Sequence, residues 1–280
     1  MSYKRIAAIH DISCFGRCSL TVALPILSAA GIETAVIPTS ILSTHTGGFS
    51  GYTFRELTDD ILPVADHWKK EGITVPAVYT GYLGSKEQVD LVISAIDIIA
   101  EKNALVVVDP VMADNGRLYG GFPEDFPKYM TKLCKRADII VPNITEACLL
   151  LDKPYTDGPY SEDFINELLL GLYDLTKAKV VLTGVWFDFK RIGAACFDGE
   201  NAEYVFSKRI DKSYHGTGDV FASTLVSGVM NGKDLKTSAL AAVDFTCECI
   251  NNTIKLQPNE NYGVCFETVI PKLLKMLGLV

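Results

Sequence analysis

The chain has 280 residues, 48% of them hydrophobic, and 34 acidic residues outnumber 26 basic ones to give a formal charge of −8 at pH 7. This length and composition predict one folded domain spanning residues 1–280 and exclude a disordered chain. The chain carries no basic tract, so we expect neither nucleic acid nor a membrane as a partner, and the apolar run 6–9 is too short for a signal sequence or a membrane span. We therefore expect a cytoplasmic protein.

Strand and helix patterns alternate along the first half of the chain. In chain order they predict a strand at 5–9, a helix at 17–30, a strand at 33–37, a glycine-rich loop at 43–52, a helix at 55–70, a strand at 77–80, a helix at 85–102 and a strand at 105–108. The β-branched run 105–108 is typical of a strand that is covered on both faces.

The second half continues this alternation after a long loop at 111–127 that carries a helix near its end. We expect a strand at 139–141, a helix that begins at Pro142, a helix at 161–176, a strand at 179–183, an antiparallel pair at 194–197 and 203–206, and helices at 219–231, 235–254 and 266–277. Alternating strands and helices predict an α/β fold, with a mostly parallel central sheet between helices on both faces.

The stretch from His215 to Ala222 is the most informative one. Gly216 and Gly218 bracket a tight turn that opens an apolar helix, so the amides of Gly216, Thr217 and Gly218 would point out of a helix N-terminus, where they favour a phosphate or a developing anion. Asp219 in the first turn has two interpretations. It is either a carboxylate that stabilises the helix dipole or a base that takes a proton from an attacking hydroxyl.

Polar residues follow several of the predicted strands, at the edge where parallel sheets bind ligands. They are Asp11, His45, Thr46, Tyr82, Asp109, Asn143, Glu146 and Thr183. Structural alternatives exist for some of them. Asp109 with Pro110 could end a strand, Asn143 and Glu146 match a helix capping box, Tyr82 could be a half-buried aromatic, and His45 could bond within its own loop. Their gathering at one edge favours a binding site.

Other motifs for nucleotides or hydrolysis do not fit. The chain has no G-x-x-x-x-G-K-[ST] and no G-x-S-x-G, and Phe221 stands where a dinucleotide fingerprint needs its third glycine. The eight cysteines form no C-x-x-C pair and none of the four histidines lies four residues from another, so we expect reduced thiols and neither a zinc site nor a redox dithiol.

Five segments together resemble the ribokinase-like superfamily and, within it, the vitamin B6 kinases. These are Gly216-Thr217-Gly218-Asp219, the run 80–85 (TGYLGS), the run 109–112 (DPVM), Pro142-Asn143 with Glu146, and the run 43–47 (STHTG). The resemblance covers nearly the whole chain. It implies a single-domain, three-layer ribokinase-like kinase that phosphorylates the 5′-hydroxymethyl group of pyridoxal, pyridoxine or pyridoxamine with ATP.

The resemblance also implies roles for individual residues. Asp219 would be the base, and the amides of Gly216, Thr217 and Gly218 would hold the charge on the transferred phosphoryl group. Substrate contacts would come from Asp11, His45, Thr46, Gly47, Tyr82 and Asp219. Contacts with ATP would come from Asp109, Asp114, Val141, Asn143, Glu146, Thr183, Lys208, Arg209, Ile210, Gly216, Thr217 and Gly218. Glu146 would organise Mg²⁺ through water, with Asp109 beside the cation, and the family commonly uses K⁺ and forms homodimers.

Three positions depart from the family's pattern. Many B6 kinases have Ser where this chain has Asp11, and an anion there favours an amine-bearing vitamer, so we hypothesise a preference for pyridoxamine. Val141 replaces a Thr of some relatives, and the segment 207–215 is shorter than in others.

Three alternative functions remain. Hydroxymethylpyrimidine kinases usually place Cys at the position of Asp219, and sugar kinases need an N-terminal lid for which the predicted helix 17–30 leaves no room. A non-catalytic binder of a vitamer or a nucleotide would need no base.

Overall fold

The centre of the molecule is one sheet of nine strands. In the computed structural model, which describes residues 4–212, 214–256 and 262–280, the strands are β1 (Arg5–Ser13), β2 (Glu33–Leu42), β3 (Phe54–Glu56), β4 (Val75–Thr80), β5 (Ala100–Val108), β8 (Ile139–Ile140), β9 (Lys179–Asp188), β10 (Arg191–Phe197) and β11 (Ala202–Lys208). Their spatial order is β11-β10-β9-β8-β5-β4-β1-β2-β3. The six strands from β9 to β2 are mutually parallel, and β3, β10 and β11 add antiparallel edges. The expected mostly parallel sheet is confirmed.

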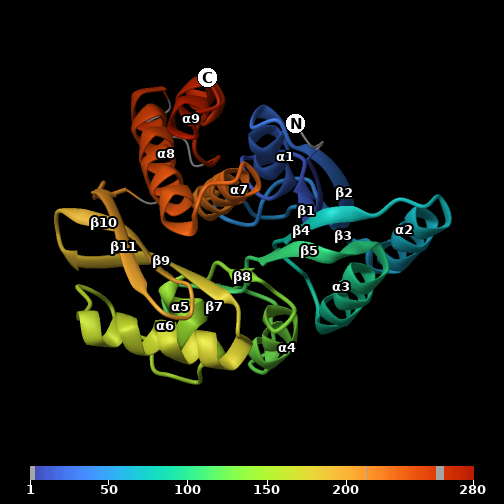
Figure 1. Ribbon diagram of the computed structural model, residues 1–280, viewed down its shortest axis with the longest axis horizontal. Helices are drawn as coiled ribbons and strands as arrows, with labels where there is room; N and C mark the ends of the chain where they lie inside the picture. The colour runs from blue at the N-terminus through green and yellow to red at the C-terminus, as the bar shows by residue number, and fades with distance from the viewer. Residues whose placement is uncertain (1–3, 213, 257–261) are drawn as a thin grey trace.

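Helices cover both faces of this sheet (Figure 1). One layer contains α1 (Leu20–Ala29), α7 (Thr217–Met230), α8 (Leu235–Leu256), the short 3₁₀ turn η1 (Glu267–Val269) and α9 (Ile270–Met276). The other contains α2 (Thr58–Lys70), α3 (Lys86–Ile99), α4 (Phe126–Cys134), α5 (Ile144–Leu150) and α6 (Glu162–Thr176). The buried apolar residues form two clusters, one between the sheet and each helical layer, as a three-layer α/β fold requires. Within the described residues, no helix has the length and apolar composition needed to cross a bilayer.

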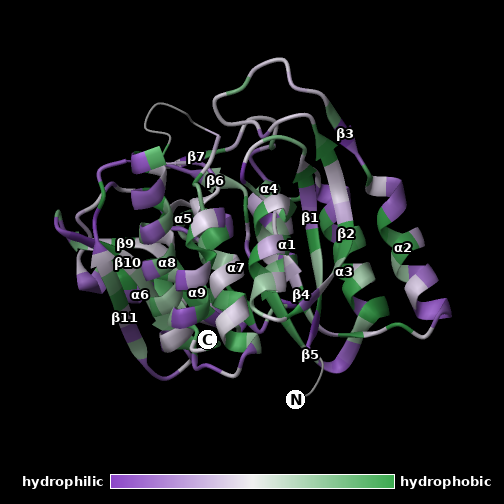
Figure 2. Cartoon of the chain, turned by 90° about the horizontal axis from the view of Figure 1, so that it is seen from above, coloured by the Kyte–Doolittle hydropathy of each residue, from purple (hydrophilic) through white to green (hydrophobic). Residues whose placement is uncertain are grey.

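The order of the strands creates a switch point beside β1. From β1 the chain continues to β2 on one side and then crosses to β4 on the other, so the connections leave β1 and β4 in opposite directions. In open parallel sheets, the carboxyl ends of such a strand pair bound the place where ligands bind. The loop before β3 and the small hairpin of β6 (Ala113–Asp114) and β7 (Arg117–Leu118) lie on the side of the sheet away from the N-terminus (Figure 2).

Several predicted boundaries are wrong in the first half of the chain. The helix predicted at 17–30 begins at Leu20, because Ser19 has a φ of 51° that no helix allows. Residues 55 and 56 of the helix predicted at 55–70 belong instead to β3, whose residues pair with Ser40, Ile41 and Leu42 of β2. The helix predicted to reach residue 102 ends at Ile99, because Ala100 already pairs with Val75.

Other differences concern the length of strands. β1, β2 and β9 extend beyond the predicted 5–9, 33–37 and 179–183 to Ser13, Leu42 and Asp188. In each case tertiary pairing with a neighbouring strand continues past the apolar run on which the prediction depended. The loop predicted at 111–127 contains the β6–β7 hairpin, whose turn is formed by Asn115 and Gly116 at positive φ.

Candidate active site

Two of the predicted residues lie on either side of the switch point. Asp11 is near the carboxyl end of β1 and is only 4% exposed, and Tyr82 follows the end of β4. The turn after β4 is held against β1, because the Gly81 amide donates to the carbonyl of Ile9 at 3.1 Å. Burial raises the pKa of the Tyr82 hydroxyl to about 12, and the charge of Asp11 acts in the same direction.

The glycine corner before α7 packs directly on the loop that follows β1. Gly216 has a φ of +77°, and a Cβ built there would lie 1.9 Å from the carbonyl oxygen of Arg17, so no other residue fits without moving the backbone. The first amides of α7 have no acceptor one turn earlier in the helix. The corner therefore presents amide donors at the predicted helix N-terminus.

The loop that follows β2 reaches the same corner. A Cβ on Gly47 would lie 2.1 Å from the imidazole of His215, the residue that precedes Gly216. His45 Nδ1 accepts a hydrogen bond from the Gly47 amide at 3.1 Å, as its structural interpretation predicted, and Thr46 is exposed. The loop is thus brought beside the glycine corner, and a contact of His45 or Thr46 with substrate stays a prediction.

Asp219 is a half-buried carboxyl group in the first turn of α7. Desolvation by the surrounding protein raises its pKa to about 7, the charge of Asp11 acts in the same direction, and a hydrogen bond from the amide of Ser19 opposes both. Burial likewise raises the pKa of Asp11 to about 6, against hydrogen bonds from Ser19 and Ser13. Asp11 near the end of β1 and Asp219 at the start of α7 are therefore close enough for their charges to interact.

A second pair of carboxyl groups, Asp109 and Glu146, lies next to the first. Both are at least 93% buried, and burial raises the pKa of each. The pKa of Asp109 also rises because the charges of Glu146 and Asp219 are near, which joins this pair to the base candidate. Glu146 is firmly oriented, because its two carboxylate oxygens accept hydrogen bonds from the amides of Met112 at 3.1 Å and Asn143 at 2.9 Å.

The start of α5 connects the carboxyl ends of β5, β8 and β9. Asn143 caps the helix by accepting from the Glu146 amide at 2.9 Å, so the predicted capping box is present, and its Nδ2 donates to the carbonyl of Ala113 at 2.8 Å. The Thr183 amide donates to the carbonyl of Pro142 at 2.9 Å. Val141 is buried beside them, with 3% of its surface exposed. These predicted nucleotide residues are therefore brought together at one edge.

Two other predicted groups have local partners. Asp114 is exposed, and its carboxylate accepts from the amide of Asn115 at 2.8 Å and from the Asn115 side chain at 2.9 Å. The guanidinium of Arg209 lies 3.9 Å above the ring of Trp186 and 3.4 Å from the Asp211 carboxylate. Lys208 is the exposed last residue of β11, and Ile210 is half-buried. The connection from there to α7 includes Ser213, which lies outside the described residues.

Sequence reasoning missed three residues that the structure places at this edge. Ser19 lies near both Asp11 and Asp219 and acts to lower the pKa of each. Gln88, in α3, is fully buried, accepts from the Gly84 amide at 2.8 Å and donates to the carbonyl of Thr39 at 2.8 Å, so it fixes the turn that carries Tyr82. Tyr119 is 41% exposed, and partial desolvation and then the nearby charge of Glu146 raise its pKa. In the sequence, Ser19 has the signature of an N-cap, and the other two carry no recognisable signal.

The residues at this site suit Mg²⁺ only in partnership with a phosphate. Within the described ranges, no group of three or more acidic, histidine or cysteine side chains is arranged to hold a metal. Mg²⁺ commonly takes one or two carboxylates and completes its coordination with phosphate oxygens and water. The raised pKa values of Asp109 and Glu146 mark the place where a cation would stabilise the ionised forms.

The arrangement combines three chemical capacities at one edge of the sheet. A carboxyl group with a pKa of about 7 can accept a proton near neutral pH, a helix N-terminus can bind a phosphoryl group, and two buried carboxylates can hold a cation. Phosphoryl transfer to a hydroxyl needs all three.

Comparison with known proteins agrees with this chemistry. A sequence model described as phosphomethylpyrimidine kinase matches residues 25–264. A structure from Bacteroides thetaiotaomicron, provisionally assigned as a phosphomethylpyrimidine kinase and determined with pyridoxal, is 35% identical and covers 97% of this chain and 96% of its own, with a TM-score of 0.90.

Two pyridoxal kinases are similar over nearly their whole length. The structure of the enzyme from Lactobacillus plantarum is 30% identical, with a TM-score of 0.89 and coverage of 99% of this chain and 98% of its own. The enzyme of Pasteurella multocida is 24% identical and covers 92% of this chain and 91% of its own. Sequence, fold and site geometry agree, and the chain belongs to the phosphomethylpyrimidine kinase family of ribokinase-like kinases.

Proposed function

We propose that this kinase transfers the γ-phosphoryl group of ATP to the 5′-hydroxymethyl group of a vitamin B6 vitamer, for salvage of pyridoxal 5′-phosphate. The feature that carries the proposal is Asp219 at the glycine-cornered start of α7. Burial and the charge of Asp11 raise its pKa to about 7, and its own charge raises the pKa of Asp109. The similarity to proteins described as pyridoxal kinases supports a pyridine as the acceptor.

In this proposal the residues divide into an acceptor side and a donor side. Asp11, Tyr82 and the loop that carries His45, Thr46 and Gly47 bind the pyridine. Asp219 accepts the proton of its hydroxyl group. General-base assistance is worth roughly 10²–10⁴-fold in such steps.

On the donor side, the amides of Gly216, Thr217 and Gly218 hold the charge on the phosphoryl group during transfer. The nucleotide residues are Asp109, Asp114, Val141, Asn143, Glu146, Thr183, Lys208, Arg209 and Ile210. Asp109 and Glu146 would hold Mg²⁺, which neutralises phosphate charge when it is bound. The fixed orientation of Glu146 supports a contact through water.

The proposal is tested by incubating the protein with Mg-ATP and each candidate acceptor, and by following both ADP and the phosphorylated product. We expect turnover of pyridoxal, pyridoxine and pyridoxamine, and none of ribose. Because Asp11 is a buried carboxyl group, we also expect the highest kcat/KM for pyridoxamine. A clear advantage for pyridoxal would reject that preference and leave the kinase assignment standing.

Hydroxymethylpyrimidine is the second candidate acceptor. The name of the family and that of the Bacteroides structure favour it, whereas Asp219 at the position where such kinases usually carry Cys argues against it. In the same assay, a kcat/KM for hydroxymethylpyrimidine tenfold or more above that of every B6 vitamer would replace the proposed function with this one.

Four further expectations accompany the proposal as predictions: one kinase domain over residues 1–280, a homodimer, a cytoplasmic location and a requirement for a monovalent cation such as K⁺. Light scattering tests the homodimer, and the dependence of kcat on KCl tests the requirement for a monovalent cation.

A further inference from the structure

Three aromatic rings from distant parts of the chain meet beside the loop that follows β2, residues 43–52. Phe49 belongs to this loop, Phe15 to the loop that follows β1, and Tyr262 to the segment that leads into η1. The rings of Phe49 and Tyr262 are stacked with their centroids 5.7 Å apart. The ring of Phe15 meets both edge-on, at 6.2 Å from Phe49 and 5.1 Å from Tyr262. Tyr262 therefore connects the C-terminal segment to both loops.

Phe49 also contacts the part of its loop that approaches the glycine corner. The imidazole of His45 meets the ring of Phe49 edge-on at 5.0 Å and lies 5.1 Å from the imidazole of His215. The His45 amide donates to the carbonyl of Phe15 at 3.3 Å. A Cβ on Gly16 would lie 2.2 Å from the His45 ring, so the two loops are in close contact here. The packing of Phe49 therefore helps to fix its loop relative to the residues that begin α7.

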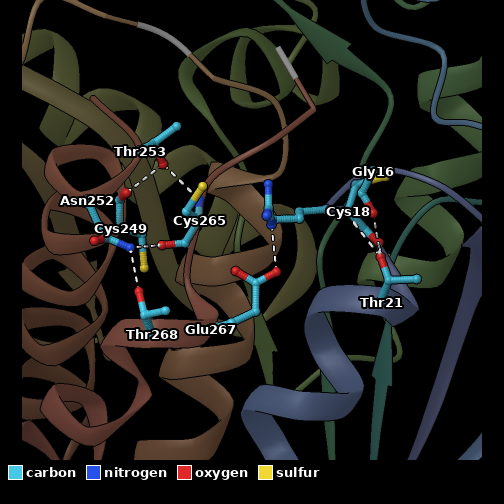
Figure 3. Close-up of polar contacts among 10 residues, drawn as sticks. Gly16, Cys18, Thr21, Cys249, Asn252, Thr253, Cys265, Glu267 and Thr268 are labelled. Atoms are coloured by element: carbon cyan, nitrogen blue, oxygen red, sulfur yellow. Dashed lines mark hydrogen bonds and ion pairs between the residues drawn. The ribbon is translucent and has the colours of Figure 1, made fainter. Parts of the chain in front are cut away.

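The segment that carries Tyr262 is itself anchored on α8. The side chain of Asn252 donates to the carbonyl of Cys265 at 2.8 Å and to Thr268 Oγ1 at 2.9 Å (Figure 3). The Cys265 amide donates to Thr253 Oγ1 at 2.7 Å, and both of these residues are buried. Tyr262 is therefore attached to a rigid element outside the two loops.

The same segment is joined to the loop that follows β1 through Arg17. The Arg17 amide donates to the carbonyl of Tyr262 at 2.8 Å, and its guanidinium pairs with the Glu267 carboxylate at 2.6 Å (Figure 3). A Cβ on Gly263 would lie 2.7 Å from the carbonyl oxygen of Arg17, and a Cβ on Gly216 would lie 1.9 Å from it. The C-terminal segment and the glycine corner therefore pack on the same peptide group.

The aromatic cluster lies at the surface of the molecule. Phe15 is 52% exposed, and none of the three rings belongs to either of the two buried apolar clusters. Contacts of this kind order a local segment more than they stabilise the whole fold. We expect the packing of Tyr262 to act mainly on the loop 43–52.

We propose that Tyr262 is a positioning residue, whose ring holds Phe49 and with it the loop 43–52 against the start of α7. This loop carries His45, Thr46 and Gly47, which we assign to the acceptor, so Tyr262 acts on acceptor binding through the loop. The assignment of the loop to the acceptor depends on the proposed function, whereas the ring contacts do not.

Hydrogen exchange measured by mass spectrometry on the full-length protein tests this role without using activity. The amides of Ser43, His45 and Thr53 are hydrogen-bonded, so they report on the order of the loop. Tyr262→Ala removes two ring contacts, so we expect peptides that cover 43–53 to exchange about five- to fiftyfold faster. Tyr262→Phe keeps the ring and should exchange as the parent does.

Phe49→Ala removes the stacked pair from the side of the loop. It should accelerate exchange at least as much as Tyr262→Ala does, even if the latter variant folds poorly. Because the two rings act through one contact, the double variant should exceed Phe49→Ala by no more than about twofold. Effects that multiply in the double variant, or unchanged exchange of 43–53 in both single variants, would overturn the proposal.

Tyr204→Ala is the matched control, because Tyr204 also stacks on a phenylalanine. Its ring lies 6.3 Å from that of Phe206, and both belong to β11, at the opposite edge of the sheet from β3. This variant should accelerate exchange in β11 and leave the peptides that cover 43–53 unchanged. An equal acceleration of 43–53 in Tyr204→Ala would show a general loss of stability and would contradict a specific role for Tyr262.

Kinetics test the consequence for the acceptor. In Tyr262→Ala, KM for the vitamer should rise about five- to tenfold, while kcat and the Kd for ATP stay within about twofold of the parent values. Tyr262→Phe should restore the parent KM. A fall in kcat with an equal loss of ATP affinity would mean that Tyr262 has only a structural role. If the parent enzyme turns over no vitamer, the proposed function fails, and hydrogen exchange still decides whether Tyr262 positions the loop.

Discussion

Asp219, the proposed base, illustrates how the protein around a carboxyl group can change its pKa. An unperturbed aspartate has a pKa near 3.9 and is a weak base at neutral pH. Desolvation and the neighbouring Asp11 raise the pKa of Asp219 to about 7, where the ionised form is still abundant and the proton is held more strongly. The amide of Ser19 acts in the opposite direction and limits this rise in the pKa.

The first prediction concerns the dependence of activity on pH. Asp219 must be ionised to accept a proton, and it is ionised above its pKa, so kcat/KM should fall as the pH decreases through about 7. Below this value the fall should approach tenfold per pH unit and steepen near pH 6, where Asp11 also takes up a proton. A profile from pH 5 to 9 measures this, and a flat profile down to pH 5 would contradict the assignment.

Two candidate site residues could be identified in the sequence because each belongs to a short motif. Asp219 lies within a glycine turn, and Glu146 follows Asn143 at capping-box spacing. The position of Ser19 near Asp11 and Asp219 could not be predicted, because it depends on a positive φ that the sequence does not indicate. Gln88 was missed because its partners lie on β2 and in the turn after β4.

At the scale of elements, the start of α7 depends on two glycines for different reasons. Gly216 has a positive φ and no space for a Cβ beside the Arg17 carbonyl. Gly218 has ordinary helical geometry, and a Cβ there would meet nothing within 4 Å. Stability therefore requires the first glycine, and the second leaves room for the phosphoryl group that we propose to bind at this helix end.

The second prediction separates these two roles. Gly218→Ala should leave the Tm unchanged or slightly higher, because alanine favours a helix by up to about 1 kcal/mol, while kcat falls at least tenfold as the methyl group obstructs the phosphoryl group. Gly216→Ala should lower both the Tm and the activity. Gly232→Ala, at the other end of α7 with a φ of +80° and open space, is the control that should cost about 1 kcal/mol of stability without changing kcat.

The order and type of most elements followed from the sequence, and their ends did not. Apolar periodicity predicted the helices and the central strands, because each buries one face or both. The edge strand β3 and the β6–β7 hairpin were missed. Their residues are mostly exposed, so only pairing with a neighbouring strand defines them.

At the scale of the whole molecule, the charge of the protein is −8, and four carboxyl groups lie at the site where we propose that ATP binds. They belong to Asp11, Asp109, Glu146 and Asp219. A carboxyl group whose pKa is higher in the native protein than in the unfolded chain stabilises the native state only while it is protonated. Their contribution to stability is present at low pH and is lost as the pH rises through the native pKa. Without a cation, the site should therefore be a source of instability at neutral and alkaline pH.

The third prediction follows from this charge cluster. Asp109→Asn removes one buried charge, so in EDTA at pH 8 we expect its Tm to exceed that of the parent by about 2–5 °C, with a much smaller difference at pH 5. Mg-ATP should raise the Tm of the parent more than that of the variant. Thermal denaturation at both pH values measures this, and an equal or lower Tm for the variant at pH 8 would contradict it.

The central claim is that Asp219 takes the proton of the acceptor hydroxyl. The most direct measurement is kcat of Asp219→Asn with Mg-ATP and a B6 vitamer, together with the Kd for ATP, because asparagine keeps the shape of the side chain and removes the base. We predict a fall in kcat of about 10²–10⁴-fold with a Kd for ATP within a few-fold of the parent value. Turnover near that of the parent would contradict the assignment of the base and, with it, this account of the site.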